Sequence, residues 1–215
     1  MRVCFVTDGA PSMEMQALEQ ADLYLFAALQ REISYERELK GETRFFEDVA
    51  RLSKREKGVA ICGCITNARG HKRKSAVVAE NGRLMGVSDM LHAIDSEIAC
   101  GAGLRVYETR AGKIGVAVAD DLRFPSVIHS LAVCGSDCIV CPTAQIRDIH
   151  GVLARSHAYC FGVPILLCAR GYALAASAEG EIVFSSPLKS SVFDLPTTKE
   201  YHLVETRRRL ICAKE

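Results

Sequence analysis

Short apolar runs, separated by turn residues and by longer amphipathic stretches, set the strongest limit on the fold of this chain. Few of the runs alternate strictly between apolar and polar residues, which favours strands covered on both faces or packed against a second sheet. The expected strands are residues 2–6, 22–26, 59–65, 75–79, 83–87, 104–108, 114–119, 138–141, 164–169, 173–177, 182–185 and 202–205. A period of 3.6 residues predicts helices at 12–20, 42–57, 125–134 and 146–161. Strands mixed with flanking helices indicate an α/β or α+β sandwich.

Length and composition favour one globular domain over residues 1–215. The chain has 215 residues, of which 49% are hydrophobic and 25% charged, and a chain of this size buries most of its apolar surface in a single core. Turn residues at Asn81-Gly82 and at Gly180 predict two hairpins.

The charge balance argues against nucleic acid and membrane partners. With 27 basic and 26 acidic residues the net charge is +1, so no overall field steers the protein toward either. The densest basic runs, 71–74 and 207–209, are interpreted as solvated loops or strand ends.

The apolar runs and the cysteines indicate the cellular compartment in which we expect the protein. The first apolar run is too short for a signal peptide, and no run approaches the roughly 18 apolar residues of a membrane span. The ten cysteines lie mostly inside apolar segments, where a reduced thiol behaves as a small hydrophobe. We therefore expect free thiols and a cytoplasmic location.

Residues 112–126, GKIGVAVADDLRFPS, read as an apolar strand, a sharp turn and the start of a helix. A cysteine at such a turn is unusually acidic and nucleophilic, because the helix dipole and free backbone N–H groups stabilise its thiolate. Ala119 occupies this place.

This segment resembles the motif of the carbon-nitrogen hydrolase (nitrilase) superfamily, roughly G-x-I-G-x-x-I-C-Y-D-x-R-F-P. The matching positions are Gly112, Ile114, Gly115, Val118, Ala119, Asp120, Asp121, Arg123, Phe124 and Pro125. The resemblance spans most of the chain, from Met1 to about residue 210, and is strongest over 59–143. It implies a four-layer α-β-β-α sandwich that assembles as a homodimer or a higher homo-oligomer.

The resemblance also implies a Glu, a Lys and a Cys at the active site, and none of the three is present. Alignment puts Met90 on the lysine and Ala119 on the cysteine. A weaker alignment puts Ala28 on the glutamate, and Glu32 or Glu36 is an alternative nearby. Replacing all three charged or reactive groups by apolar ones leaves no unpaired buried charge, and such replacements are often neutral or stabilising. Met90 and Ala28 argue against an engineered alanine at 119.

The remaining candidates for the pocket are Asp120, Asp121, Arg123, His92 and Cys141. The resemblance implies that the backbone N–H of residue 120 stabilises an oxyanion and that Asp121 and Arg123 tie the turn to neighbouring strands. Helix capping is the alternative for both aspartates. His92 is the histidine nearest the expected site in the alignment, and a core hydrogen bond is its alternative role.

Three functional hypotheses follow. The first is a binding or assembly subunit without amidase or nitrilase catalysis, with a small amide or carboxylate as ligand. The second is an active carbon-nitrogen hydrolase with a relocated nucleophile, Cys100 or Cys141. The third is a module that senses a small carboxylate or amine. No cofactor and no metal is expected. Two groups of cysteines, Cys62 with Cys64 and Cys134 with Cys138 and Cys141, could be metal ligands, but Cys62 and Cys64 are not accompanied by a paired Cys/His knuckle of the usual form, and both groups are interpreted as core cysteines.

Overall fold

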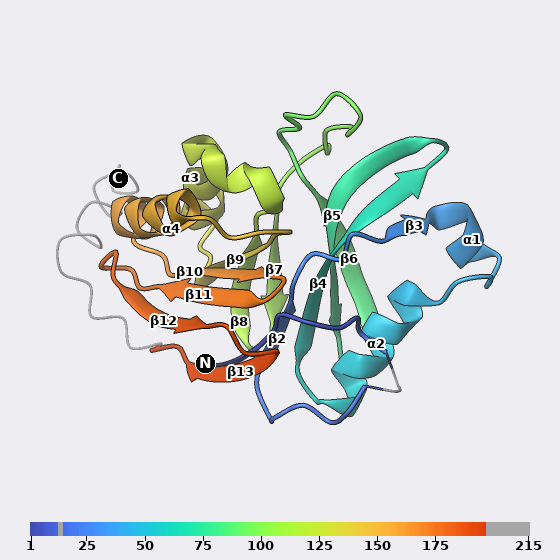
Figure 1. Ribbon diagram of the computed structural model, residues 1–215, viewed down its shortest axis with the longest axis horizontal. Coiled ribbons are helices and arrows are strands. Elements are labelled where there is room, and N and C mark those ends of the chain that lie inside the picture. The colour runs from blue at the N-terminus through green and yellow to red at the C-terminus, as the bar shows by residue number, and fades with distance from the viewer. Residues whose placement is uncertain (13–14, 197–215) are drawn as a thin grey trace, which may run out of the picture.

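The computed structural model describes residues 1–12 and 15–196, and its strands form two sheets (Figure 1). The first sheet has the order β13 (Ser190–Asp194), β1 (Arg2–Val6), β2 (Leu23–Phe26), β4 (Val59–Ala68), β5 (His71–Glu80) and β6 (Arg83–Asp89), and β3 (Glu32–Ser34) pairs with β4. The second has the order β12 (Ile182–Ser186), β11 (Tyr172–Ala176), β10 (Ile165–Ala169), β9 (Cys138–Pro142), β8 (Gly112–Val116) and β7 (Arg105–Thr109).

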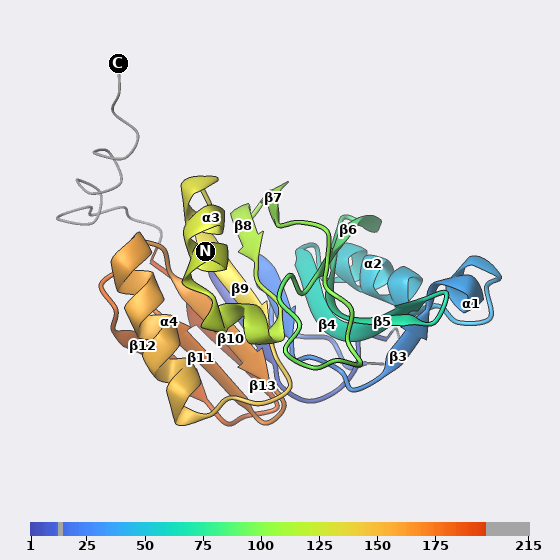
Figure 2. The same cartoon turned by 90° about the horizontal axis from the view of Figure 1, so that it is seen from above.

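Helices cover the outer face of each sheet. Helix α2 (Phe45–Arg55) packs on β4, β5 and β6, whereas α3 (Pro125–Val133) and α4 (Asp148–Phe161) pack on the second sheet. Figure 2 shows the two sheets between these helices. A short helix α1 (Tyr35–Leu39) follows β3, and a 3₁₀ turn η1 (Ala119–Arg123) precedes α3. The expected four-layer α-β-β-α sandwich is therefore confirmed.

The central strands, such as β1 and β9, are apolar on both faces because each contributes to two cores. In β1, Val3 and Phe5 lie in the core between the sheets, and Cys4 and Val6 lie in the core under α2. In the second sheet, Val140 faces the other sheet while its neighbours Ile139 and Cys141 face α3 and α4. Period-2 geometry thus converts a continuous apolar run into two buried faces.

Each expected strand inside the described residues overlaps an observed strand, and the one at 202–205 lies outside them. The helix expected at 12–20 is wrong, because the described residues of that stretch form no helix. Tertiary contacts override its helical period: the Met15 carbonyl accepts a hydrogen bond from Arg55, and Glu19 pairs with Arg2. The short elements β3, α1 and β13 were not predicted.

The parallel strands bring several chain connections to one edge. Strands β1, β2 and β4 are mutually parallel, as are β8, β9 and β10. The backbone N–H of Ala28, after β2, donates to the Thr143 carbonyl, after β9, at 3.2 Å. The carboxyl ends of strands from both sheets therefore meet there, the usual place for ligand sites in open α/β sheets. Among the described residues, no helix has the length and apolar character needed to cross a membrane.

Candidate functional site

The turn after β8 holds Ala119 in a left-handed backbone conformation. Strand β8 ends at Val116, and η1 begins at Ala119, whose φ is 49°. A left-handed conformation costs an L-residue other than glycine about 1–2 kcal/mol. Contacts from the surrounding structure must therefore fix this turn.

The Asp121 carboxylate provides those contacts. It is fully buried and accepts hydrogen bonds from the backbone N–H of Leu91 at 3.0 Å, of His92 at 3.1 Å and of Val118 at 3.3 Å. Burial raises the pKa of this carboxyl group, and the three N–H donors oppose that rise. Asp121 caps its own turn and also ties it to the loop after β6, which combines the two roles considered from the sequence.

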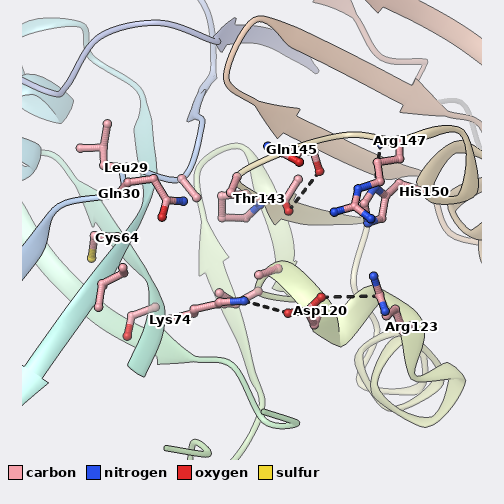
Figure 3. Close-up of a pocket in the computed structure, with 17 residues that line it drawn as sticks. Leu29, Gln30, Cys64, Lys74, Asp120, Arg123, Thr143, Gln145, Arg147 and His150 are labelled. Carbon is pink, nitrogen blue, oxygen red and sulfur yellow. Dashed lines mark hydrogen bonds and ion pairs between the residues drawn. The ribbon is translucent and has the colours of Figure 1, made fainter. Parts of the chain in front are cut away.

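Ala28 and Ala119 line one cavity of about 180 Å³ at the carboxyl edge of the strands (Figure 3). Ala28 approaches β4 so closely that a Cβ added at Gly63 would lie 2.8 Å from the Ala28 Cα and 3.0 Å from the Pro142 Cβ. Glycine at position 63 is thus required by packing. The two positions that the resemblance aligns with a glutamate and a cysteine are thus both alanines in the wall of the same cavity.

Lys74 enters the cavity from β5 and pairs with Asp120 of η1. Its Nζ lies 2.8 Å from one Asp120 oxygen, and the other oxygen is 3.5 Å from the Arg123 Nε (Figure 3). The Lys74 side chain is 34% exposed and that of Asp120 is 23% exposed, so solvent weakens the pair only in part. The sequence interpretation had taken Lys74 for a solvated residue of a basic run.

The start of α4 contributes the opposite wall. Arg147, the residue before α4, and His150 in its first turn both line the cavity, as does Gln145. The Arg147 backbone N–H donates to the His150 Nδ1 at 2.9 Å. Burial, together with the charges of Arg123 and Arg147, lowers the pKa of His150. This imidazole is therefore neutral near pH 7.

The family model described as carbon-nitrogen hydrolase matches residues 15–193. The chain belongs to the carbon-nitrogen hydrolase family. Its curated relatives include a probable nitrilase of Schizosaccharomyces pombe, 36% identical over 69 residues. That match covers 31% of this chain and only 25% of the relative, about a quarter of its length.

Solved structures of the nitrilase superfamily share the fold. Nit3 of Saccharomyces cerevisiae, described as a member of branch 10 of the superfamily, superposes with a TM-score of 0.75 at 16% identity, over 100% of this chain and 95% of that one. A mutant of an amidase from Nesterenkonia AN1 superposes with a TM-score of 0.74 at 15% identity, over 98% and 97% of the two chains. At this level of identity the likeness concerns the fold alone.

Not all residues that the carbon-nitrogen hydrolase motif singles out reach the cavity. Asp120 and Arg123 line it together with Ala28 and Ala119. Met90 is fully buried in the core between the sheets, and its N–H donates to the Lys74 carbonyl at 2.8 Å. The cavity wall beside the lysine position is consequently formed by Lys74 and not by a thioether.

His92 and Cys141 are likewise not among the residues that line the cavity. The His92 ring stacks on Phe124 with 4.1 Å between centroids, and its Nδ1 is 3.7 Å from an Asp121 oxygen. The Cys141 thiol is fully buried and contacts the Ala119 carbonyl at 3.6 Å. Burial is the main cause that raises the pKa of Cys141 far above its usual range.

Three side chains with nucleophilic atoms, Cys64, Ser75 and Thr143, line the cavity, and none of them was predicted from the sequence to lie there. Burial raises the pKa of Cys64 to about 12. The Ser75 hydroxyl is buried between Thr66 at 2.7 Å and Asp89 at 2.6 Å, and the Thr143 hydroxyl lies 3.5 Å from the Gln145 carbonyl. Within the part of the chain that the structure describes, no group of three His, Cys, Asp or Glu side chains is placed to hold a metal ion.

Proposed function

We propose that this chain is a cytoplasmic member of the carbon-nitrogen hydrolase family that binds a small ligand and does not hydrolyse it. The observation that carries the proposal is Ala119, which has the left-handed turn conformation, lines the cavity and has only a methyl group as its side chain. Covalent catalysis needs a nucleophile at such a position, with a base within hydrogen-bond reach. A methyl group provides neither.

The other groups near the cavity give little support to a substitute nucleophile. A thiol attacks as its thiolate, and a pKa of about 12 leaves Cys64 protonated at neutral pH. The Ser75 hydroxyl is already engaged by two polar side chains. Cys100 is exposed and is not part of the cavity wall.

Ammonia release tests the proposal directly. Purified protein is incubated with short aliphatic amides, nitriles and N-carbamoyl amino acids, and ammonia is measured against a buffer blank. We expect no release above the blank with any of them. Saturable turnover that disappears in Cys64→Ala, a change in the cavity wall, would overturn the proposal.

The alternative is an active hydrolase with a relocated nucleophile, and mass spectrometry separates it from a binding protein. A trapped acyl-enzyme on Cys100 or Cys141, mapped by peptide digestion after incubation with an amide, would support the hydrolase. An unmodified chain under conditions of full ligand saturation supports binding alone.

We also propose that the protein is a homodimer through the outer face of α4. Ile149, Val152 and Tyr159 lie on one side of α4 and are 50%, 56% and 44% exposed, and Val133 at the end of α3 is 54% exposed. Helix positions i, i+3 and i+10 share a face, so the three side chains of α4 form an apolar stripe.

Light scattering coupled to size exclusion tests the dimer. Val152→Glu places a charge in the stripe, and we expect it to convert a dimer into a monomer. Leu188→Glu is the matched control, because Leu188 is 61% exposed and belongs to the β12–β13 connection, where its carbonyl accepts a hydrogen bond from Thr7 after β1. A monomeric wild-type protein at micromolar concentration would contradict the proposal.

A further inference from the structure

The cavity wall carries more positive than negative charge. Lys74, Arg123 and Arg147 line it, and Asp120 is the one carboxylate among the described residues that do so. Asp120 is shared by Lys74 and Arg123. Arg147 has no ion pair with any residue in the described part of the chain. A cavity with this surplus attracts an anion.

The tautomer of His150 also favours an anionic ligand. A backbone N–H only donates, so the His150 Nδ1 that receives the Arg147 N–H must be the unprotonated nitrogen. The ring proton of the neutral imidazole is then on Nε2. His150 is 8% exposed and lines the cavity, and Nε2 has no hydrogen-bond partner in the described part of the chain. This N–H is available to donate a hydrogen bond to a ligand in the cavity.

The cavity is polar at one end and more apolar at the other. Figure 3 shows Arg123, Arg147 and His150 on one side and the Lys74–Asp120 pair in the middle. On the other side lie Leu29 and Cys64, with the uncharged amide of Gln30 as the polar group beside them. The volume of about 180 Å³ compares with roughly 150 Å³ for a protein cavity that takes benzene. A ligand that fills the cavity therefore has a short apolar body as well as a charged group.

We propose that the ligand of this cavity is a small monocarboxylate, whose carboxylate is bound by Arg147, His150 and Lys74 and whose short apolar body lies toward Leu29. The inference rests on the proposed binding function and adds the chemical class of the ligand. An arginine fork and a neutral N–H donor match the two oxygens of a carboxylate. A cationic amine is disfavoured by the surplus of positive charge. A neutral amide has only one acceptor oxygen, so one hydrogen-bond donor of the site would have no partner.

Isothermal titration of the full chain tests the class of ligand. The probes are acetate, butyrate, hexanoate and benzoate, each paired with its own amide, and inorganic phosphate. We expect each carboxylate to bind about tenfold tighter than its amide, since hydrogen bonds between charged groups are the stronger ones. Affinity should rise about fourfold per added methylene until the cavity is full.

Two variants and one control assign the binding to this cavity. Arg147→Gln keeps an amide donor and removes the charge, and we expect it to weaken benzoate binding about tenfold. His150→Phe removes the Nε2 donor and should weaken benzoate binding more than benzamide binding, because a hydrogen bond to a charged oxygen is the stronger one. Lys113→Gln is the control, because Lys113 is half-exposed and pairs with Glu108 on the β7–β8 hairpin. It should bind benzoate as the wild type does.

The outcomes separate the two proposals. Equal affinity for benzoate and benzamide, or wild-type affinity in Arg147→Gln, would overturn the carboxylate inference and leave the binding function in place. Phosphate binding tighter than butyrate binding would also overturn it, because phosphate gains nothing from an apolar wall. Hydrolysis of an amide together with tight carboxylate binding would overturn the absence of catalysis and support the inference. If no probe binds, the inference falls, while the ammonia assay still decides on catalysis.

Discussion

The ammonium group of Lys74 lies 2.8 Å from the carboxylate of Asp120, the residue that follows the alanine at the turn. This pair links β5 of the first sheet to η1 beside the second sheet. It also leaves a positive group in the cavity although residue 90, where the motif predicts a lysine, is a buried methionine. The positive charge in the cavity therefore comes from residue 74 on β5 and not from residue 90.

Asp120→Asn should strengthen carboxylate binding. The substitution keeps the shape of the side chain but removes the anion shared by Lys74 and Arg123, so both cations become available to a ligand. We expect about a tenfold lower Kd for benzoate, measured by titration calorimetry. The free energy of unfolding should change by no more than about 1 kcal/mol, because the pair is partly exposed.

Glu108→Gln is the matched control for that change. Glu108 pairs with Lys113 at 3.0 Å on the β7–β8 hairpin, and the substitution removes one acid from an ion pair outside the cavity wall. Its Kd for benzoate should equal that of the wild type. Weaker binding in Asp120→Asn would show that Asp120 positions the cations and does not compete for them.

Ala119→Cys should create a reactive thiol without restoring hydrolysis. Residue 119 faces a cavity lined by three cations, and nearby positive charge lowers a thiol pKa. We expect iodoacetamide to alkylate the new thiol at least about tenfold faster than Cys64, whose pKa burial raises to about 12. Peptide mapping by mass spectrometry reads each site separately. No ammonia should be released from amides, since position 28 still lacks a carboxylate.

Ala117→Cys is the control for accessibility. Ala117 is two residues earlier in the same segment and fully buried, so a thiol there should resist alkylation in the folded protein. Amide turnover by Ala119→Cys would contradict the prediction, because it would reveal a base that the cavity wall provides by other means.

Gly63→Ala should destabilise the protein and distort the cavity. The added Cβ would lie 2.8 Å from both the Cα and the Cβ of Ala28, so backbone must move. Overpacking of this kind costs about 1–3 kcal/mol, which urea unfolding followed by circular dichroism measures. Gly103→Ala is the control, because a Cβ at Gly103 meets nothing within 4 Å. Equal stability of the two variants would contradict the close approach of Ala28.

Acid should destabilise the fold through His157. The ring is buried, its Nε2 lies 3.0 Å from the Leu122 carbonyl, and burial lowers its pKa. The unfolded chain therefore takes up a proton near pH 6.5 that the folded chain does not. The stabilising contribution is fully present above that pH and is lost as the pH falls through the folded pKa, with a slope of up to about 1.4 kcal/mol per pH unit.

His157→Gln should reduce that pH dependence. Glutamine keeps a donor for the Leu122 carbonyl and does not titrate in this range. Urea unfolding at pH 7 and pH 5 should show a smaller loss of unfolding free energy in the variant than in the wild type. His150, whose pKa is also lowered, contributes with the same sign and remains in both proteins. An unchanged difference between the two pH values would contradict the prediction.

The layers could be predicted from the sequence because a strand that is buried on both faces appears there as a continuous apolar run. Apolar runs such as 138–141 have no polar residue to place toward solvent, and the structure packs Val140 and Ile139 on opposite sides of one strand. The motif at 112–126 marks the turn equally well. The helix predicted at 12–20 is wrong because the spacing of its apolar residues is typical of a helix, whereas contacts with distant residues such as Arg55 determine the conformation of this segment.

Lys74 could not be found by motif because strand register decides where it lies. Counting back from the Asn81-Gly82 hairpin without interruption pairs residue 74 with Asp89. The irregularity between Val78 and Ala79 shifts that register by one residue, so that Ser75 pairs with Asp89. Such a bulge leaves no clear sign in a single sequence. His150 was missed because its role depends on contact with Arg147 and on a cavity between elements far apart in the chain.

The left-handed backbone at Ala119 has a consequence for protein engineering. Its conformation is imposed by the Asp121 hydrogen bonds and not by the side chain at 119 itself. A reactive side chain introduced at position 119 would therefore be placed on a pre-organised backbone. The main chain already has the strained left-handed conformation, so the new side chain does not have to impose it.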